Sequence, residues 1–214
     1  MKERKIPVNR IIVSSLLIFL PTLIGILLWN KLPEQIPTHF DINNQPDSFS
    51  SKTFTVFVIP LIMFVLNLIA IFVTVSDPKY KNIGQKNINL VLWIVPATSI
   101  LVSVLSYGTA LNYQLNVGKA VLYFMGVLLI VLGNYLPKAK QNYSLGIKTS
   151  WALEDEENWN ITNRVSGYMF VIGGIATIIS TALFSNPYIF FAILLIITAV
   201  PTCLSYYLYI KKNK

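Results

Sequence analysis

Charged side chains are missing from six long stretches of this chain. Only 12% of its 214 residues are charged, against roughly 25% in soluble domains, whereas 54% are hydrophobic. The charge-free stretches are residues 11–30, 54–75, 90–111, 120–136, 167–184 and 188–210. Because the apolar residues gather in these long blocks, the composition excludes an ordinary soluble domain.

Each block is long enough to cross a bilayer as a helix. About 20 helical residues span a hydrocarbon core of about 30 Å, and lipid offers the backbone no hydrogen-bond partner outside the helix. The sequence therefore predicts an all-α, polytopic membrane protein, a bundle of six transmembrane helices. We expect the first block to stay uncleaved, since it is too long for a signal-peptide core and contains Pro21.

Histidine and cysteine are almost absent, which limits the chemistry of the chain. The single Cys203 excludes an intramolecular disulfide and is expected to be a small packing residue, and His39 is the one histidine. A metal site or an intramembrane enzyme needs a cluster of ligands or a nucleophile with a base. We therefore expect no metal, no cofactor and no enzymatic activity. Asn67, the most polar side chain deep in a span, is expected to bond a neighbouring helix.

Lysine and arginine are distributed unevenly between the connections. Fourteen lie on the side of the amino terminus and three on the other. By the positive-inside rule, both termini are predicted to be cytoplasmic. The net charge of +8 is then a sign of topology, and binding to nucleic acid is not expected. The fourteen are Lys2, Arg4, Lys5, Arg10, Lys79, Lys81, Lys86, Lys138, Lys140, Lys148, Arg164, Lys211, Lys212 and Lys214, and the three are Lys31, Lys52 and Lys119.

The predicted outer loop, residues 31–53, is one of two connections long enough for specific chemistry. Leu32-Pro33 and Ile36-Pro37 favour extended backbone, and a turn-forming stretch follows. In an extended segment His39 and Asp41 point the same way, and Asp47 is the nearest further ligand. A hydrogen-bonded cap is favoured over a metal site. The candidate residues in this loop are Pro37, His39, Asp41 and Asp47.

The predicted inner loop, residues 137–166, is the other long connection. An acidic run at 154–157 suits the positive end of a helix, and Trp159, Asn163, Ser166 and Gly167 recur at helical spacing. This second half is predicted to be a helix that either guides the chain into the fifth span or offers a surface to a partner. Prolines within four spans indicate packing shape or hinges.

Residues 133–167, called here the signature segment, resemble the signature of the SdpI family of bacterial membrane proteins. The outer loop resembles a domain often found before that signature, so we divide the chain into residues 1–75 and 76–214. Lys148, Ser150 and Asn163 stand where arginine, proline and histidine are usual, and Asn44 replaces a turn glycine. The signature matches are Gly133, Asn134, Asn142, Gly146, Ile147, Thr149, Trp151, Leu153, Glu157, Trp159, Thr162, Arg164 and Gly167, and the outer-loop matches are Leu32, Pro33, Ile36, Pro37, His39, Phe40, Asp41, Asp47, Ser51 and Lys52.

The resemblance implies a role in toxin immunity. Its named member protects a bacterium from its own secreted killing peptide and draws a transcriptional repressor to the membrane. The expected partners are membrane lipids, a secreted toxin peptide and a cytoplasmic repressor. A transporter or channel for a small molecule or peptide is the alternative, although the spans lack the carboxylates used in ion coupling. The candidate residues of the signature segment are Asn134, Asn142, Gly146, Lys148, Thr149, Trp151, Trp159 and Arg164.

Overall fold

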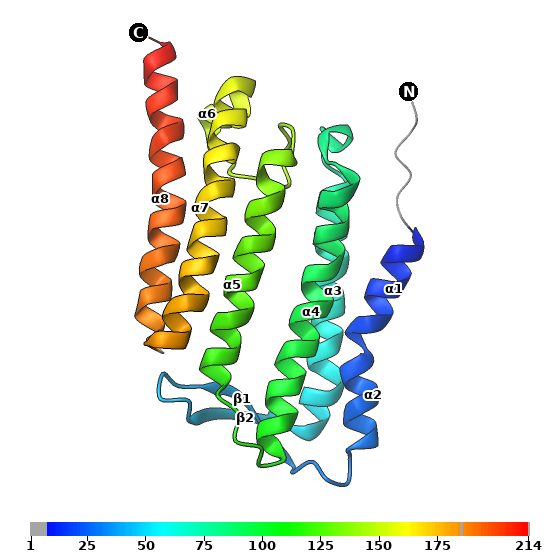
Figure 1. Ribbon diagram of the computed structural model, residues 1–214. Helices are drawn as coiled ribbons and strands as arrows, with labels where there is room; N and C mark the ends of the chain where they lie inside the picture. The colour runs from blue at the N-terminus through cyan, green and yellow to red at the C-terminus, as the bar shows by residue number, and fades with distance from the viewer. Residues whose placement is uncertain (1–7, 185, 214) are drawn as a thin grey trace. The chain divides into compact units, whose positions relative to one another are not determined.

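The computed structural model describes residues 8–184 and 186–213 (Figure 1). Six helical segments in this part of the chain are long and apolar enough to cross a membrane, which confirms the predicted all-α, multi-pass membrane protein. These segments are Val8–Leu27, Phe54–Val75, Gln85–Ala110, Val117–Lys138, Glu156–Leu183 and Pro187–Lys212. Lys2, Arg4, Lys5 and Lys214, which contribute to the predicted sidedness, lie outside the described residues.

The chain forms two compact units, the first of which contains the described residues up to Val75 together with Ile88–Gly118. Its first span is broken at Phe19, because Pro21 in the first turn of the second piece has no backbone N–H to give. A π-helical turn, Phe54–Val58, leads into the second span. The helices are α1 (Val8–Ile18), α2 (Leu20–Leu27), α3 (Ile59–Val75) and α4 (Gln85–Ala110), and the strands are β1 (Gln35–Phe40) and β2 (Pro46–Ser51).

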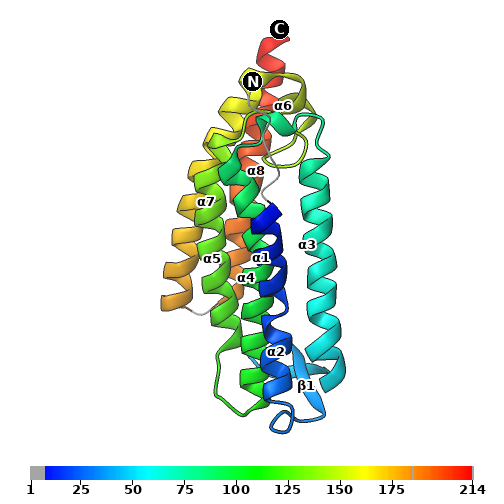
Figure 2. The ribbon, with the colours of Figure 1, turned by 90° about the vertical axis from the view of Figure 1, so that its right-hand side faces the viewer.

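The strands β1 and β2 pair antiparallel as a hairpin beside the ends of α2 and α3 (Figure 2). The ladder is irregular between Pro37 and Phe40, as expected where a proline lacks its N–H donor. Leu32 and Ile36 pack with Val56 and Tyr107 in a buried apolar cluster. The expected hydrogen-bonded cap is therefore a two-stranded hairpin on an apolar base.

The second unit contains Ser76–Asn87 and the described residues from Lys119 onward. Leu129 of α5 meets Phe190 and Ile197 of α8 in its apolar cluster. The helix α7 begins at Glu156, earlier than the predicted span, because helical hydrogen bonds continue into its polar first turns. The elements are η2 (Tyr80–Asn82), α5 (Val117–Tyr135), η3 (Leu136–Lys138), α6 (Ser150–Glu154), α7 (Glu156–Leu183) and α8 (Pro187–Lys212).

Two expectations about single side chains are wrong. Cys203 is exposed rather than packed, because α8 turns the face with Ile197, Pro201 and Ser205 inward, and Cys203 lies off that line. Asn67 is fully buried on α3, but neither its amide nitrogen nor its oxygen has a hydrogen-bond partner among the described residues. The predicted hydrogen bond from Asn67 to a neighbouring helix is therefore absent from the described part of the chain.

Candidate functional site

Lys52 fixes the base of the hairpin. Its side chain is 8% exposed and lies 2.8 Å from the Glu34 carboxylate. The ammonium donates hydrogen bonds to the carbonyl oxygens of Trp29 (3.2 Å) and Leu32 (3.3 Å), just after α2. It also lies 4.9 Å from the centre of a Trp29 ring. A buried cation needs such compensation, and the carbonyls beyond a helix C-terminus supply it. Lys52 therefore holds the hairpin to the end of α2.

The four candidate residues of the outer loop fall into two groups. Pro37 is buried, and Asp41 accepts backbone hydrogen bonds from Gln45 (2.8 Å) and Asn43 (2.9 Å). The hydrogen bond from Gln45 is the main cause that lowers the pKa of Asp41, and the bonds from Asn43 add to it. These two residues shape the loop and the turn.

His39 and Asp47 form the exposed group of the outer loop. Their side chains are 68% and 46% exposed, and His39 Nδ1 lies 2.5 Å from a carboxylate oxygen of Asp47. The partner of His39 is therefore Asp47 across the hairpin, whereas the sequence placed Asp41 beside it. Both side chains remain open to a ligand.

Asn44 ties the hairpin tip to the loop after α4 and to the start of α5, which the sequence analysis did not predict. Its φ of 64° lies in the left-handed region, where asparagine is tolerated almost as glycine is. The side chain donates a hydrogen bond to Leu115 O (3.0 Å) and accepts one from Gly118 N (3.2 Å). Asn44 thus both forms the turn and anchors the hairpin.

Trp159 is the centre of the signature segment in the second unit. It is fully buried, and its indole N–H donates to Ala139 O at 2.9 Å. Gly146 has a φ of +119°, and a Cβ there would lie 2.9 Å from the Trp159 ring and 2.7 Å from Asn163 Oδ1. Asn163 accepts a hydrogen bond from Ile147 N at 2.8 Å. The backbone therefore packs on Trp159 at a place where only glycine fits.

Asn142 and Asp77 shape the turn that precedes Gly146. Asn142 is fully buried and accepts hydrogen bonds from Ser144 N (2.9 Å) and Leu145 N (2.7 Å). Asp77, 6% exposed, accepts from Tyr143 N (2.8 Å) and from the Ser144 hydroxyl (2.6 Å). The sequence analysis missed Asp77, although an Asp-Pro pair is a known turn signal.

Thr149 and Trp151 join α6 to α8. The Thr149 hydroxyl caps α6 and lies 2.6 Å from the Ser205 hydroxyl. Ser205 in turn donates to Asn158 Oδ1 at 2.8 Å. Trp151 packs against Tyr206, with ring centres 4.9 Å apart. Thr149 is therefore a structural residue, and Trp151 covers the end of α8.

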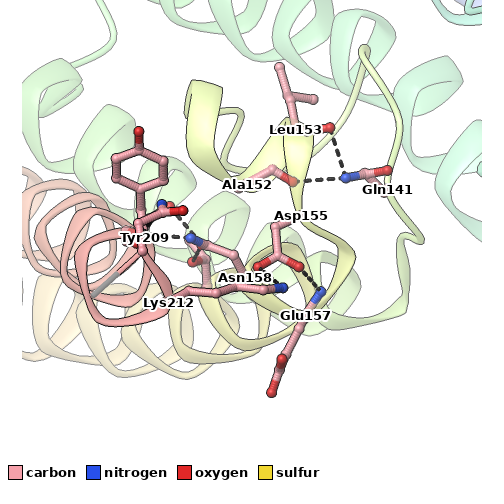
Figure 3. Close-up of polar contacts among 11 residues, drawn as sticks. Gln141, Ala152, Leu153, Asp155, Glu157, Asn158, Tyr209 and Lys212 are labelled. Carbon is pink, nitrogen blue, oxygen red and sulfur yellow. Dashed lines mark hydrogen bonds and ion pairs between the residues drawn. The ribbon is translucent and has the colours of Figure 1, made fainter.

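The junction of α6 and α7 is held by polar contacts (Figure 3). Gln141 donates hydrogen bonds to the carbonyl oxygens of Ala152 and Leu153, both at 2.9 Å. Asp155 caps α7 by accepting from Glu157 N, and it pairs with Lys212 of α8 at 2.8 Å. The hydrogen bond from Lys212 is the main cause that lowers the pKa of Asp155. The acidic run thus lies at the helix start, as predicted.

The remaining candidates lie on the surface of the second unit. Asn134 is exposed and accepts a hydrogen bond from Lys138 at 3.2 Å. Lys148 is exposed and donates to Tyr143 O (3.2 Å) and Ser144 O (3.3 Å). Arg164 is exposed and has no side-chain hydrogen bond or ion pair within residues 8–184 and 186–213. Together with part of Trp151, these side chains are accessible to a partner.

His39 and Asp47 form a pair that no third His, Cys, Asp or Glu side chain completes as a metal site in the described part of the chain. Among the described residues no three such side chains come close enough to hold a metal ion.

Two families match different parts of the chain. Residues 138–205 match the SdpI/YfhL protein family, and residues 16–64 match a domain of unknown function, DUF1648. The first match covers most of the signature segment together with α7 and much of α8. The second covers the hairpin and part of the span on each side of it.

One relative is similar along almost the whole chain. Immunity protein SdpI of Bacillus subtilis (strain 168) is 28% identical over 208 residues, which cover 94% of this chain and 97% of that protein. No solved structure matches the chain. The signature residues, the six candidate spans and this full-length similarity agree, which confirms the resemblance to the SdpI family.

Proposed function

We propose that this chain is an immunity protein of a bacterial cell membrane, which protects the cell against a secreted killing peptide. The observation that carries the proposal is the similarity to Immunity protein SdpI over 94% of the chain. The hairpin supports it, because His39, Asp47 and several apolar side chains are exposed on the side predicted to face outward. A peptide that approaches the membrane from outside meets these groups first.

Protection in this proposal works by binding and needs no catalytic step. His39 is paired with Asp47, and no hydroxyl or thiol of the described residues is hydrogen-bonded to its ring. A nucleophile with an adjacent base is therefore not assembled around this histidine. Binding keeps the peptide away from its target. The buried hydrogen-bond network around Trp159 stabilises the second unit.

A signalling role is the finer part of the proposal. The exposed Lys148 and Arg164 and the half-buried Trp151 offer two cations and an aromatic ring to a cytoplasmic repressor. Aromatic and arginine side chains contribute strongly at protein interfaces. Peptide binding can change this surface only if the peptide prefers one arrangement of the chain over another.

A toxin-challenge assay tests the proposed function. A peptide-sensitive bacterium carries this chain, Immunity protein SdpI of Bacillus subtilis as the positive control, or an empty vector. We expect the chain to raise the peptide concentration needed for killing, at a membrane level equal to that of the control. Survival no better than with the empty vector contradicts the proposal.

Two variants test the exposed part of the signature segment. Arg164→Ala and Trp151→Ala are compared with Glu154→Ala, which removes an exposed side chain of the same segment. If Arg164 and Trp151 act in protection or signalling, each variant lowers the tolerance of the killing peptide or the binding of the repressor, while the amount of protein in the membrane stays equal. Peptide tolerance and repressor binding equal to those of Glu154→Ala mean that neither side chain acts in protection or signalling.

A further inference from the structure

We propose that a pocket in the first unit, between the hairpin and the end of α4, binds an uncharged segment of the killing peptide. This inference rests on the proposed function and adds the place and the chemical class of the ligand. The pocket has a volume of about 340 Å³. It is lined by Phe40, Asn44, Thr109, Tyr113, Gln114, Leu115 and Asn116.

The size of the pocket limits what can enter. Ligand sites have volumes of about 300–1,000 Å³, so this pocket is at the small end of that range. It accommodates one or two side chains with their backbone, whereas a whole helix does not fit. The ligand therefore inserts a short segment and leaves the rest of its chain outside.

The lining of the pocket carries no ionisable acid or base except the phenol of Tyr113. An ionised side chain buried there finds no opposite charge, and desolvation disfavours it. Amides and hydroxyls, in contrast, both donate and accept hydrogen bonds, as a peptide backbone requires. This chemistry selects an uncharged segment whose backbone groups remain free to bond.

Thr109 supplies an unused hydrogen-bonding group at the pocket. Its hydroxyl oxygen is inaccessible to solvent and has no partner among the described residues. Gln114 is exposed, and its side-chain amide forms no hydrogen bond in the same part of the chain. Buried polar groups are nearly always paired, and rotation of the Thr109 side chain about χ1 would turn this unpaired hydroxyl toward a ligand in the pocket.

The walls of the pocket are held in place before any ligand arrives. Asn44 bonds to Leu115 O and Gly118 N, and Tyr113 N donates to Gly108 O at 3.0 Å. Asn112 has a φ of 64°, which sets the turn that presents Tyr113. A preformed site loses little conformational entropy on binding.

Tyr113 is the anchor expected at the mouth of the pocket. Its side chain is 65% exposed, and aromatic rings of this kind dominate the energetics of many interfaces. Tyr188 of α8 is 64% exposed but does not line the pocket. This tyrosine is therefore a matched control for exposure and residue type.

The test measures binding of one defined probe to the full chain in lipid nanodiscs. The probe is the purified, fluorescently labelled killing peptide against which Immunity protein SdpI protects. We expect Tyr113→Ala to weaken its binding about tenfold and Tyr188→Ala to leave it unchanged. Thr109→Val, which keeps the shape and removes the hydroxyl, is expected to weaken binding several-fold. Affinity is expected to be nearly independent of salt, because no ion pair forms.

The outcomes separate the pocket from the proposed function. If the chain protects cells but Tyr113→Ala and Thr109→Val bind like the wild type, the pocket is wrong and the immunity function stands. If the pocket variants lose binding but the wild-type chain gives no protection, the pocket stands and the function is wrong. Absence of binding to the wild-type chain, or a steep salt dependence, overturns the pocket proposal. Circular dichroism confirms that each variant is folded.

Discussion

Asp77 is the residue on which the turn of the signature segment depends most. Besides Tyr143 and Ser144, its carboxylate accepts a hydrogen bond from Lys79 N at 2.7 Å. We expect Asp77→Ala to destabilise the second unit by about 1–3 kcal/mol, because it leaves buried donors unpaired. Asp77→Asn keeps one acceptor oxygen and is expected to cost less. Hydrogen exchange at the amide of Tyr143 measures the effect directly.

Glu154→Ala is the control for Asp77→Ala. Glu154 is exposed and lies in the same unit, so its removal is expected to leave stability within about 0.5 kcal/mol of the wild type. Equal exchange rates at Tyr143 in the two variants mean that the Asp77 hydrogen bonds contribute nothing.

Asp155 gives a second prediction at the scale of the residue, and this one concerns pH. Its pKa in the folded chain is lowered, chiefly by the hydrogen bond from Lys212. The contribution of Asp155 to stability is therefore complete above about pH 3.9, the ordinary pKa of an aspartate. It is lost as the pH falls through the lowered pKa of the folded chain. No change is expected between pH 7 and pH 5.

A carboxyl-carbon NMR titration of Asp155 checks this expectation. Lys212→Gln removes the main cause of the shift, so the titration midpoint of Asp155 is expected to move upward. High salt is expected to move it in the same direction, because both side chains are partly exposed. A midpoint that is unchanged by Lys212→Gln contradicts the role given to this ion pair.

The sequence predicted single residues well where the local pattern was sufficient. Trp159, Asn163, Ser166 and Gly167 recur at helical spacing and all lie on the buried face of α7. Asp77 was missed because Tyr143 and Ser144 follow it by more than 60 residues, and only the folded chain brings them to its carboxylate. The candidate residues of the signature segment were predicted as a group, but their division into buried and exposed members needed the structure.

At the scale of the element, two glycine pairs bring α5 and α7 into close contact. Gly133 pairs with Gly167, and Gly126 pairs with Gly174, so both helices use a spacing of seven residues. A Cβ on Gly133 would lie 2.6 Å from Gly167 O and 2.8 Å from Val171 N. Membrane helices use such small residues to pack closely, since lipid provides little hydrophobic drive between them.

Gly133→Ala is expected to force α5 and α7 apart. The added methyl meets backbone atoms that cannot rotate away, and overpacking of this kind costs about 1–3 kcal/mol. The thermal midpoint in detergent is expected to fall by several degrees. Gly84→Ala is the matched control, because a Cβ at Gly84 meets nothing within 4 Å. Equal melting of the two variants shows that the close approach is not required.

The helical elements were predictable because the backbone of each apolar run must form its own hydrogen bonds inside the bilayer, which a helix does. The start of α7 at Glu156, before the apolar run at residue 167, was also indicated, because the acidic run at 154–157 and the helical spacing after it predicted a helix in the second half of the inner loop. The hairpin was expected only as extended chain with a turn. Its two strands have six residues each and little alternation of polar and apolar side chains, so periodicity gave no signal for pairing.

At the scale of the whole molecule, the orientation in the membrane remains a prediction from charge. Six spans place both termini on one side, and lysine and arginine favour the cytoplasm in short connections. We therefore expect the hairpin outside the cell and the exposed residues of the signature segment inside. The immunity proposal depends on this, because the hairpin must meet a peptide that comes from outside.

Cysteine labelling of intact cells tests the orientation. With the native thiol removed by Cys203→Ser, a single cysteine is introduced by Asn43→Cys in the hairpin or by Lys148→Cys in the signature segment, both at exposed positions. A membrane-impermeant maleimide is expected to label Asn43→Cys in intact cells. Labelling of Lys148→Cys is expected only after the membrane is opened. The reverse labelling pattern would place the hairpin in the cytoplasm. A secreted peptide could then not reach the pocket beside the hairpin.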